Sequence, residues 1–445
     1  MSGPTTNRHA PKETVEMKAF QGRARGFAQA RAAQEPPALR RTLPPRAAYA
    51  LVAAVVGLSL FASGIPSPLY GTYQALWGFS PVVLTLVYAT YAGGVLVALI
   101  AAGRVSDEIG RRPVLLVALA ALMGSAVMFV LADSVAWLFV ARAVQGLATG
   151  LALGAASAAL LELHPRRDPT AVGLTNGVVS AGGLGLGVLV SSVLVQLLPA
   201  PRVIPYVLLF LLFGIAFAGA VWMPEPVARH SRPRLAPQHP GVPPSARRAF
   251  RLASLGVISS WSLAGLFLSL GPELASSLFH TADHLATGLS VFALCGPSAA
   301  AQVVFRRTSP LAGAEFGSVI LAAGTVVIVT AVASHSSALF LVGVVVAGSG
   351  FGVAFLGALR ALSGAIPPGR GASVTSAFYV VAYSALSLPA ILAGVLVTPL
   401  GLDTTFEIFG GVIAVLALAV ATEARHMRSP GRTTASGTRG VPDAA

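Results

Sequence analysis

Long apolar runs alternate with short polar segments along almost the whole chain. The runs fall at about 47–67, 81–102, 114–132, 135–161, 170–197, 203–223, 252–270, 284–305, 311–333, 337–359, 371–398 and 402–422. A helix of about 20 residues crosses the hydrocarbon core of a bilayer, so each run has the length of a membrane span. Strands of a membrane barrel would be shorter and would alternate in polarity. The pattern therefore predicts an all-α integral membrane protein with twelve transmembrane helices.

A polar, basic segment separates the first six runs from the last six. The predicted parts are a disordered basic tail (1–45), a six-helix bundle (46–223), a linker (224–250), a second six-helix bundle (251–423) and a second tail (424–445). The halves also share sequence, because Leu-Thr-Asn-Gly at 174–177 is echoed by Val-Thr-Ser-Ala at 374–377. Repeated six-helix halves joined by a long loop are typical of secondary transporters.

The composition and the charge distribution fit a membrane protein. Of the 445 residues, 55% are hydrophobic and 10% are charged, whereas a soluble domain has about 25% charged residues. A net charge of +14 could indicate nucleic-acid binding, but every Lys and Arg except Arg142 and Arg202 lies in or beside the tails and alternate loops. Such asymmetry marks the cytoplasmic side of membrane proteins. We therefore predict a multi-pass plasma-membrane protein with both termini cytoplasmic and no nucleic-acid partner.

Motifs for enzymatic or ATP-driven chemistry are missing. The chain contains no G-x-x-x-x-G-K-[ST] phosphate-binding loop and no His, Cys and Asp spacing typical of a metal site. The single cysteine, Cys295, lies inside an apolar run. We expect no enzymatic activity, no cofactor and no metal. No Asp or Glu lies at the middle of a run, which argues against a simple proton-binding carboxylate in the membrane.

The most charged short loop, at 103–113, resembles the signature between the second and third helices of the major facilitator superfamily. That signature is commonly G-x-L-x-D-R-x-G-R-R/K, and Val105 and Glu108 stand where Leu and Arg are usual. The matching residues are Gly103, Asp107, Gly110, Arg111 and Arg112. The family resemblance implies a monomeric transporter with twelve helices that binds a small-molecule substrate within the lipid bilayer.

Two further segments resemble motifs of the same superfamily. Arg142-Ala143-Val144-Gln145-Gly146 in the fourth run is similar to its R-x-x-Q-G signature. The glycine-rich fifth run partly resembles the antiporter signature of the drug/proton branch, although Val188 follows Gly187 where that signature has proline. The segment 66–70 is similar to actinobacterial-type transporters of the superfamily. Together these resemblances extend over about 46–423.

The resemblance implies a gating role for the loop signature. In the family, the carboxylate equivalent to Asp107 lies against the N-terminus of the eleventh helix, here near 369–372. Arg111 would pair with a carboxylate at the end of the fourth helix, where Glu162 is available. Such contacts hold the cytoplasmic side closed. The alternative is a basic anchor that only sets the orientation of the protein.

Arg142 and a few polar or aromatic residues are the candidates for a central cavity. A cation at that depth costs about 3 kcal/mol on insertion scales, so Arg142 is expected to be functional or paired. Gln145 lies one turn away and can share its network. Their role is either proton or substrate coupling in the cavity or a hydrogen-bond hub between helices. The other candidate cavity residues are Asn176, Trp261, Tyr379 and Tyr383.

The leading functional hypothesis is proton-coupled efflux of a small amphipathic or drug-like molecule by alternating access. A facilitator or importer of a nutrient metabolite is the alternative within transport, and the missing carboxylate favours it. A non-transporting membrane sensor is the alternative outside transport. It differs in predicting that substitution of Asp107 or Arg142 leaves any phenotype unchanged.

Overall fold

The computed structural model describes residues 42–101, 105–226, 241–281, 283–367 and 370–429, and every regular element in these ranges is helical. The first half contains α2 (Pro45–Gly64), η1 (Ser67–Leu69), α3 (Tyr70–Trp77), α4 (Pro81–Ala101), α5 (Val105–Ile109), α6 (Arg111–Val130), α7 (Val135–Leu163), α8 (Pro169–Leu197) and α9 (Ile204–Val221). The second half contains η2 (Pro244–Ala246), α10 (Arg247–Ser269), α11 (Gly271–Phe279), α12 (His284–Val304), α13 (Pro310–Ala333), α14 (Ser337–Ala365), α15 (Gly371–Leu400) and α16 (Leu402–Arg428).

Within the described residues, 12 helical segments are long and apolar enough to cross a membrane. This confirms the predicted all-α fold with twelve spans. The short helices α3, α5 and α11 were not predicted, because they are too short to show as apolar runs. Several predicted boundaries also differ: α10 begins inside the predicted linker, α14 continues to Ala365, and α16 continues to Arg428. Arg428 donates to Glu315 Oε2 at 2.6 Å, and basic residues in a last turn also complement the helix dipole.

Polar residues at the start of two long helices supply the caps that the backbone needs. Asp168 Oδ1 accepts from the backbone N–H of Thr170 at 2.8 Å at the start of α8. Asp283 Oδ1 accepts from the backbone N–H of Leu285 at 2.8 Å at the start of α12. A side-chain acceptor at this position satisfies one of the four free N–H groups of a helix start. The two capped helices, α8 and α12, contact each other across the two halves.

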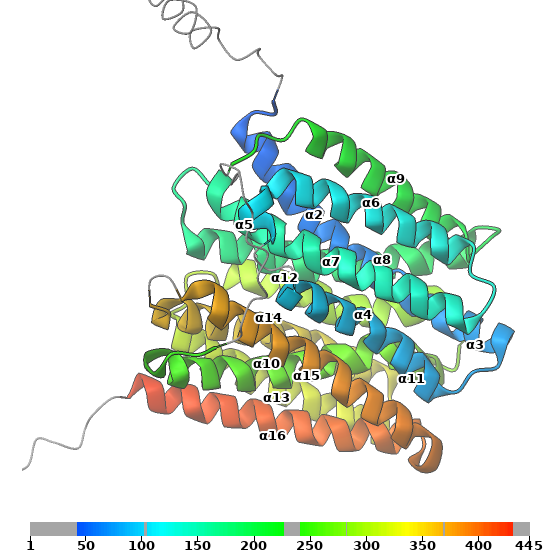
Figure 1. Ribbon diagram of the computed structural model, residues 1–445. Helices are drawn as coiled ribbons and strands as arrows, with labels where there is room; N and C mark the ends of the chain where they lie inside the picture. The colour runs from blue at the N-terminus through cyan, green and yellow to red at the C-terminus, as the bar shows by residue number, and fades with distance from the viewer. Residues whose placement is uncertain (1–41, 102–104, 227–240, 282, 368–369, 430–445) are drawn as a thin grey trace, which may run out of the picture. The chain divides into compact units, whose positions relative to one another are not determined.

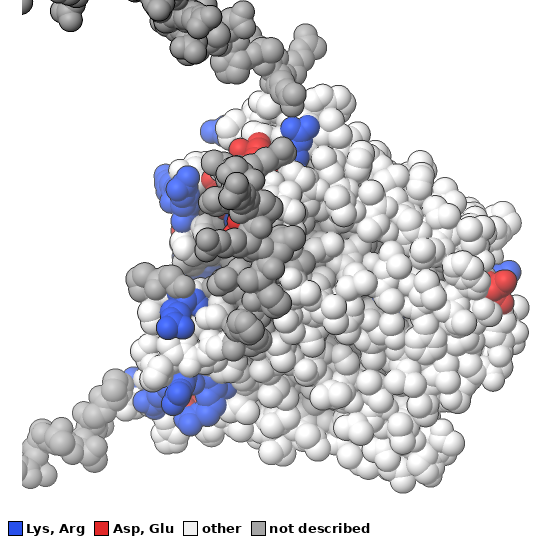
Figure 2. All heavy atoms as spheres, in the orientation of Figure 1, with Lys and Arg blue, Asp and Glu red and all other residues white. Residues whose placement is uncertain are grey.

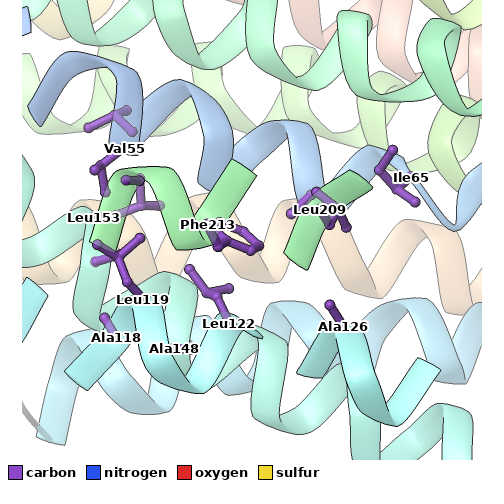
Figure 3. Packing of buried hydrophobic residues seen from close by; sticks show 14 of the residues in the cluster. Val55, Ile65, Ala118, Leu119, Leu122, Ala126, Ala148, Leu153, Leu209 and Phe213 are labelled. Carbon is purple, nitrogen blue, oxygen red and sulfur yellow. The ribbon is translucent and has the colours of Figure 1, made fainter. Parts of the chain in front are cut away.

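Each half has its own core of interlocking apolar side chains. In Figure 1, most of the blue-to-green helices of the first half lie above the green-to-red helices of the second, and α4 lies level with α12 and α14. Figure 3 shows Leu119 and Leu122 of α6 facing Phe213 of α9, all fully buried. In the second half, the ring of Phe267 lies 6.0 Å from that of Phe340. Burial of such side chains holds the helices of each half together.

The two halves meet through α8 with α12 and through α4 with α15. Small residues allow this approach. A Cβ on Gly185 of α8 would lie 2.7 Å from Cβ of Cys295 on α12, and a Cβ on Gly394 of α15 would lie 2.7 Å from Cγ2 of Thr85 on α4. Small residues at helix interfaces in membranes let backbones pack closely. At these two positions the halves approach each other through backbone and short side chains.

The charged residues gather at one end of the helices. Figure 2 shows Lys and Arg mainly at its left side, where α5 lies in Figure 1, and uncharged residues over most of the rest of this face. We call this end, with the loops that join α4 to α6 and α7 to α8, the basic end. Between the ends, large apolar side chains are exposed, including Leu211, Ile215, Val304 and Val415. An apolar belt of this kind suits contact with lipid.

Candidate functional site

A cavity lies between the two halves and is lined by residues of α2, α4, α7, α8, α10, α12, α14 and α15. Toward the basic end, its lining continues to Gly173 near the start of α8 and Ser363 near the end of α14. At the opposite end the halves are joined, because Ser67 Oγ donates to the carbonyl oxygen of Leu268 at 2.8 Å in buried surroundings. The described residues therefore form a state whose cavity extends toward the basic end and whose opposite end is closed.

One wall of the cavity is aromatic and comes from the second half. The ring of Trp261 on α10 lies 5.3 Å from that of Tyr383 on α15, edge to face, and 6.1 Å from that of Phe355 on α14. The ring of Tyr379 lies 6.2 Å from that of Tyr383. Edge-to-face and offset rings stabilise one another beyond their area of contact. The structure thus brings the predicted residues Trp261, Tyr379 and Tyr383 together on one surface.

Another part of the lining carries the amide groups of the cavity. Asn176 of α8, a predicted cavity residue, lines it together with Gln302 and Ser298 of α12. Sequence reasoning missed Gln302, because a single glutamine near the end of an apolar run resembles an interfacial residue. Its position on the face of α12 that meets α8 became visible only in the fold.

No Asp, Glu, Lys, Arg or His is among the described residues that line the cavity. Transferring an unpaired charge into such surroundings is costly, whereas an apolar body with a few hydrogen-bonding groups is accepted readily. The cavity is therefore suited to an uncharged, largely apolar ligand.

Arg142 on α7 is fully buried and joins three elements of the first half. Its Nε donates to Tyr70 Oη at 3.0 Å, and its Nη1 donates to Gln145 Oε1 at 2.7 Å and to the carbonyl oxygen of Ser63 at 3.3 Å. Gln145 Nε2 in turn donates to the carbonyl oxygen of Ala62 at 3.0 Å. The network fixes the end of α2 and the start of α3 to α7.

The positive charge of Arg142 is balanced by aromatic rings and neutral acceptors. In the described part of the chain, no carboxylate forms an ion pair with it. Its guanidinium carbon lies 5.4 Å from the ring centre of Tyr91 and 5.9 Å from that of Phe129, where ring faces attract a cation. Tyr91 lines the cavity, but Arg142 and Gln145 do not. The structure therefore places both residues in the hydrogen-bond network of the first half, and their role in coupling stays a prediction.

Arg111, the first residue of α6, binds acidic residues of its own half. Its Nη2 donates to Glu162 Oε1 at 2.8 Å, its Nη1 donates to Ser106 Oγ at 2.7 Å, and it also pairs with Asp107. Among the described residues, the structure places Arg111 against Glu162 and Asp107 against Arg111. Gly103, and residues 368–369 of the expected partner segment, lie outside the described residues. Within the ranges that the structure describes, the ion pairs of Arg111 stay in the first half, which is consistent with a cavity that extends to the basic end.

Glu225, directly after α9, organises the same loop and was missed from the sequence. Its Oε1 accepts from the backbone N–H of Arg111 at 2.8 Å, and its Oε2 accepts from that of Arg112 at 3.1 Å. The guanidinium of Arg112 also donates to the carbonyl oxygen of Val221. Gly110 has φ 110, and a Cβ there would lie 2.6 Å from Glu225 Oε2. Glycine is therefore required at 110, and Glu225 caps α6 with a negative charge.

Replacing Glu225 with alanine is expected to lower the free energy of unfolding by about 1 kcal/mol, the usual effect of losing a helix N-cap. Glu225→Gln is the intermediate control, because it keeps one acceptor oxygen and loses the charge and the second acceptor. Thermal unfolding of the purified protein should rank the wild type above Glu225→Gln and Glu225→Ala last. Equal stability of all three proteins would contradict the capping role.

Comparisons with known proteins concern the family and the fold of the chain. The family model described as Major Facilitator Superfamily matches residues 52–390. The crystal structure of the human organic anion transporter MFSD10 (TETRAN) has a TM-score of 0.63 at 17% sequence identity, covering 85% of this chain and 100% of that chain. At that identity the likeness supports the fold.

A curated relative matches part of the chain. Multidrug resistance protein D of Escherichia coli (strain K12) is 33% identical over 130 residues, which are 28% of this chain and 31% of that protein. The chain thus matches about a third of the length of that relative.

Proposed function

The chain belongs to the major facilitator superfamily, and on this premise we propose that it exports a small, amphipathic, drug-like molecule in exchange for protons. The observation that carries the proposal is the uncharged, aromatic cavity between two halves, with one end closed by a direct contact between them. The name of the multidrug resistance relative supports efflux over uptake.

The proposed mechanism is alternating access. The two halves would rock about the cavity, so that the Ser67–Leu268 contact opens as the basic end closes. In the closed form of the basic end, Asp107 would reach the start of α15, as the family signature implies. The basic end faces the cytoplasm in this proposal, in accord with the distribution of Lys and Arg.

Proton coupling is tested by following protons directly. The probe is 2-naphthamide, an uncharged aromatic amide that matches the cavity. Proteoliposomes carrying a trapped pH-sensitive dye and an imposed pH gradient should lose that gradient faster when the probe is added. Passive leakage of the probe through lipid does not disturb the test, because leakage of an uncharged amide moves no protons. A gradient that decays at the same rate with and without the probe would rule out coupling for this compound.

A facilitator remains the second candidate, because no described residue of the cavity lining is acidic or a histidine. A proton exchanger with this lining would have to bind and release its protons at groups outside the lining. A facilitator would equilibrate its substrate without responding to the gradient, so the same proteoliposomes separate the two functions.

A further inference from the structure

Two amide side chains from opposite halves, Asn176 and Gln302, line the same cavity. Gln302 of α12 is only 1% exposed. A Cβ built on Gly177 of α8 would lie 3.3 Å from Cδ of Gln302 and closer still to its Oε1. The amide of Gln302 therefore rests on the backbone of α8, next to Asn176. A larger residue at 177 would push the amide away.

These amides have acceptor oxygens that the described residues leave unused. Asn176 Oδ1 and Gln302 Oε1 are buried and accept no hydrogen bond, and the hydroxyl of Ser298 is also unpaired. The other end of the Gln302 amide makes only long contacts, at 3.4 Å to the carbonyl oxygen of Ser298 and 3.5 Å to that of Gly177. Buried polar groups are nearly always hydrogen-bonded, so three unpaired ones on a single cavity wall call for a partner.

The surroundings define the chemistry of that partner. It must donate a hydrogen bond, because the acceptor oxygens of both amide groups have no hydrogen bond among the described residues. It must be neutral, because no described residue of the lining is charged. Its remaining surface must be apolar, because Trp261, Tyr379 and Tyr383 form an aromatic wall of the same cavity.

We propose that Asn176, Ser298 and Gln302 form a hydrogen-bonding subsite that recognises a neutral N–H or O–H donor on an otherwise apolar substrate. This inference rests on the proposed transport function, since it assigns the substrate class of that cavity. The subsite combines residues of α8 and α12, so a rocking motion of the halves changes the separation of its members. A substrate held by both halves then stabilises the state described here over the alternate state, by its difference in affinity for the two.

Binding of matched naphthalene compounds to the purified full chain in detergent tests the subsite. The probe 2-naphthamide carries an N–H donor, and methyl 2-naphthoate has the same ring system without one. In Gln302→Met and in Asn176→Leu, the affinity for the amide relative to the ester should fall by about fivefold, the effect of losing one neutral hydrogen bond. Taking this ratio cancels the greater lipophilicity of the ester. Leu294→Met, a volume-conserving change in the same lining, is the control and should leave the ratio unchanged.

A variant that gains binding shows that it is folded, so a gain of affinity complements the losses expected above. Gln302→Glu places a carboxylate in an otherwise uncharged lining and should bind 2-naphthylmethylammonium about tenfold more tightly than the wild type does. Cys295 is the single cysteine and lines the cavity, so slower alkylation by N-ethylmaleimide in the presence of the amide locates the bound compound.

Three results would overturn the subsite: an unchanged amide-to-ester ratio in both variants, no gain for the cation in Gln302→Glu, or alkylation of Cys295 that ignores the amide. Because these measurements use no gradient, they are independent of coupled transport. A chain that binds as expected but shows no probe-driven proton movement would keep the subsite and lose the proposed exchange.

Discussion

Arg142→Met should reduce probe-driven proton movement in proteoliposomes by about tenfold or more, equivalent to at least about 1.4 kcal/mol. The physical reason is the position of the guanidinium. It binds Tyr70 at the start of α3 and Ser63 at the end of α2. Between these residues lies Ser67, which closes the end opposite the basic end through Leu268. Without Arg142, the segment that carries the closure loses its attachment to α7.

The stability of Arg142→Met should change less than its activity. Methionine keeps most of the apolar stem and removes a charge that has no ion-pair partner among the described residues, which relieves a desolvation cost. Against this, the hydroxyl of Tyr70 and the amide oxygen of Gln145 lose a donor, at about 1–3 kcal/mol for each group left unpaired. These effects oppose each other, so we expect a fall in melting temperature of a few degrees at most. A large fall with activity retained would identify a structural hub.

Arg142→Lys is the matched control, because it keeps the charge and loses the planar fork of donors. An ammonium group cannot reach Tyr70, Gln145 and Ser63 in the geometry that the guanidinium provides. The lysine variant should therefore fold and remain as inactive as the methionine variant. Activity near that of the wild type would show that the charge alone is needed.

The sequence was sufficient for the number and positions of the membrane spans, because each span needs an uninterrupted apolar run of fixed length. It also named Trp261, Tyr379 and Tyr383 as candidate cavity residues, and the structure places all three in the lining of one cavity. These aromatic residues lie well inside apolar runs, where a polar tip needs a cavity or a partner.

The partners of the polar residues could not be predicted in the same way. Arg142 binds Tyr70, which is 72 positions away, and Glu225 caps a helix that starts 114 positions earlier. Apolar periodicity carries little information here, because nearly every position of a span is apolar and both the lipid-facing and the buried faces look alike. Gln302 shows the same limit: its neighbour Gly177 lies in the other half, and only the packing of α8 on α12 reveals the contact.

Gly187→Ala is expected to destabilise the protein by about 2 kcal/mol or more, a typical cost of forcing atoms into a packed interior. A Cβ at this position of α8 would lie 2.8 Å from the carbonyl carbon of Phe61 on α2 and closer still to its oxygen. Both groups are backbone, so no side chain can rotate away. Helices α2 and α8 would have to separate within the first half. Thermal unfolding of the purified variant measures the loss.

Gly173→Ala on the same helix is the control for helix propensity. No atom lies within 4 Å of its Cβ position, so alanine there should stabilise the helix by up to about 1 kcal/mol. A loss of stability in Gly187→Ala together with a gain in Gly173→Ala would attribute the loss to the α2–α8 contact. Equal changes at both would contradict it.

Gly185→Ala separates packing within a half from packing between halves. Gly185 lies two residues before Gly187, but a Cβ there meets Cys295 of the second half at 2.7 Å. The contact belongs to an interface that must change during rocking, so an added methyl group raises the energy of the present state and is relieved when the halves move. We therefore expect Gly185→Ala to retain more stability than Gly187→Ala and to impair probe-driven proton movement. Gly187 would then be needed mainly for stability and Gly185 mainly for transport, because Gly187 packs on α2 and Gly185 packs on α12.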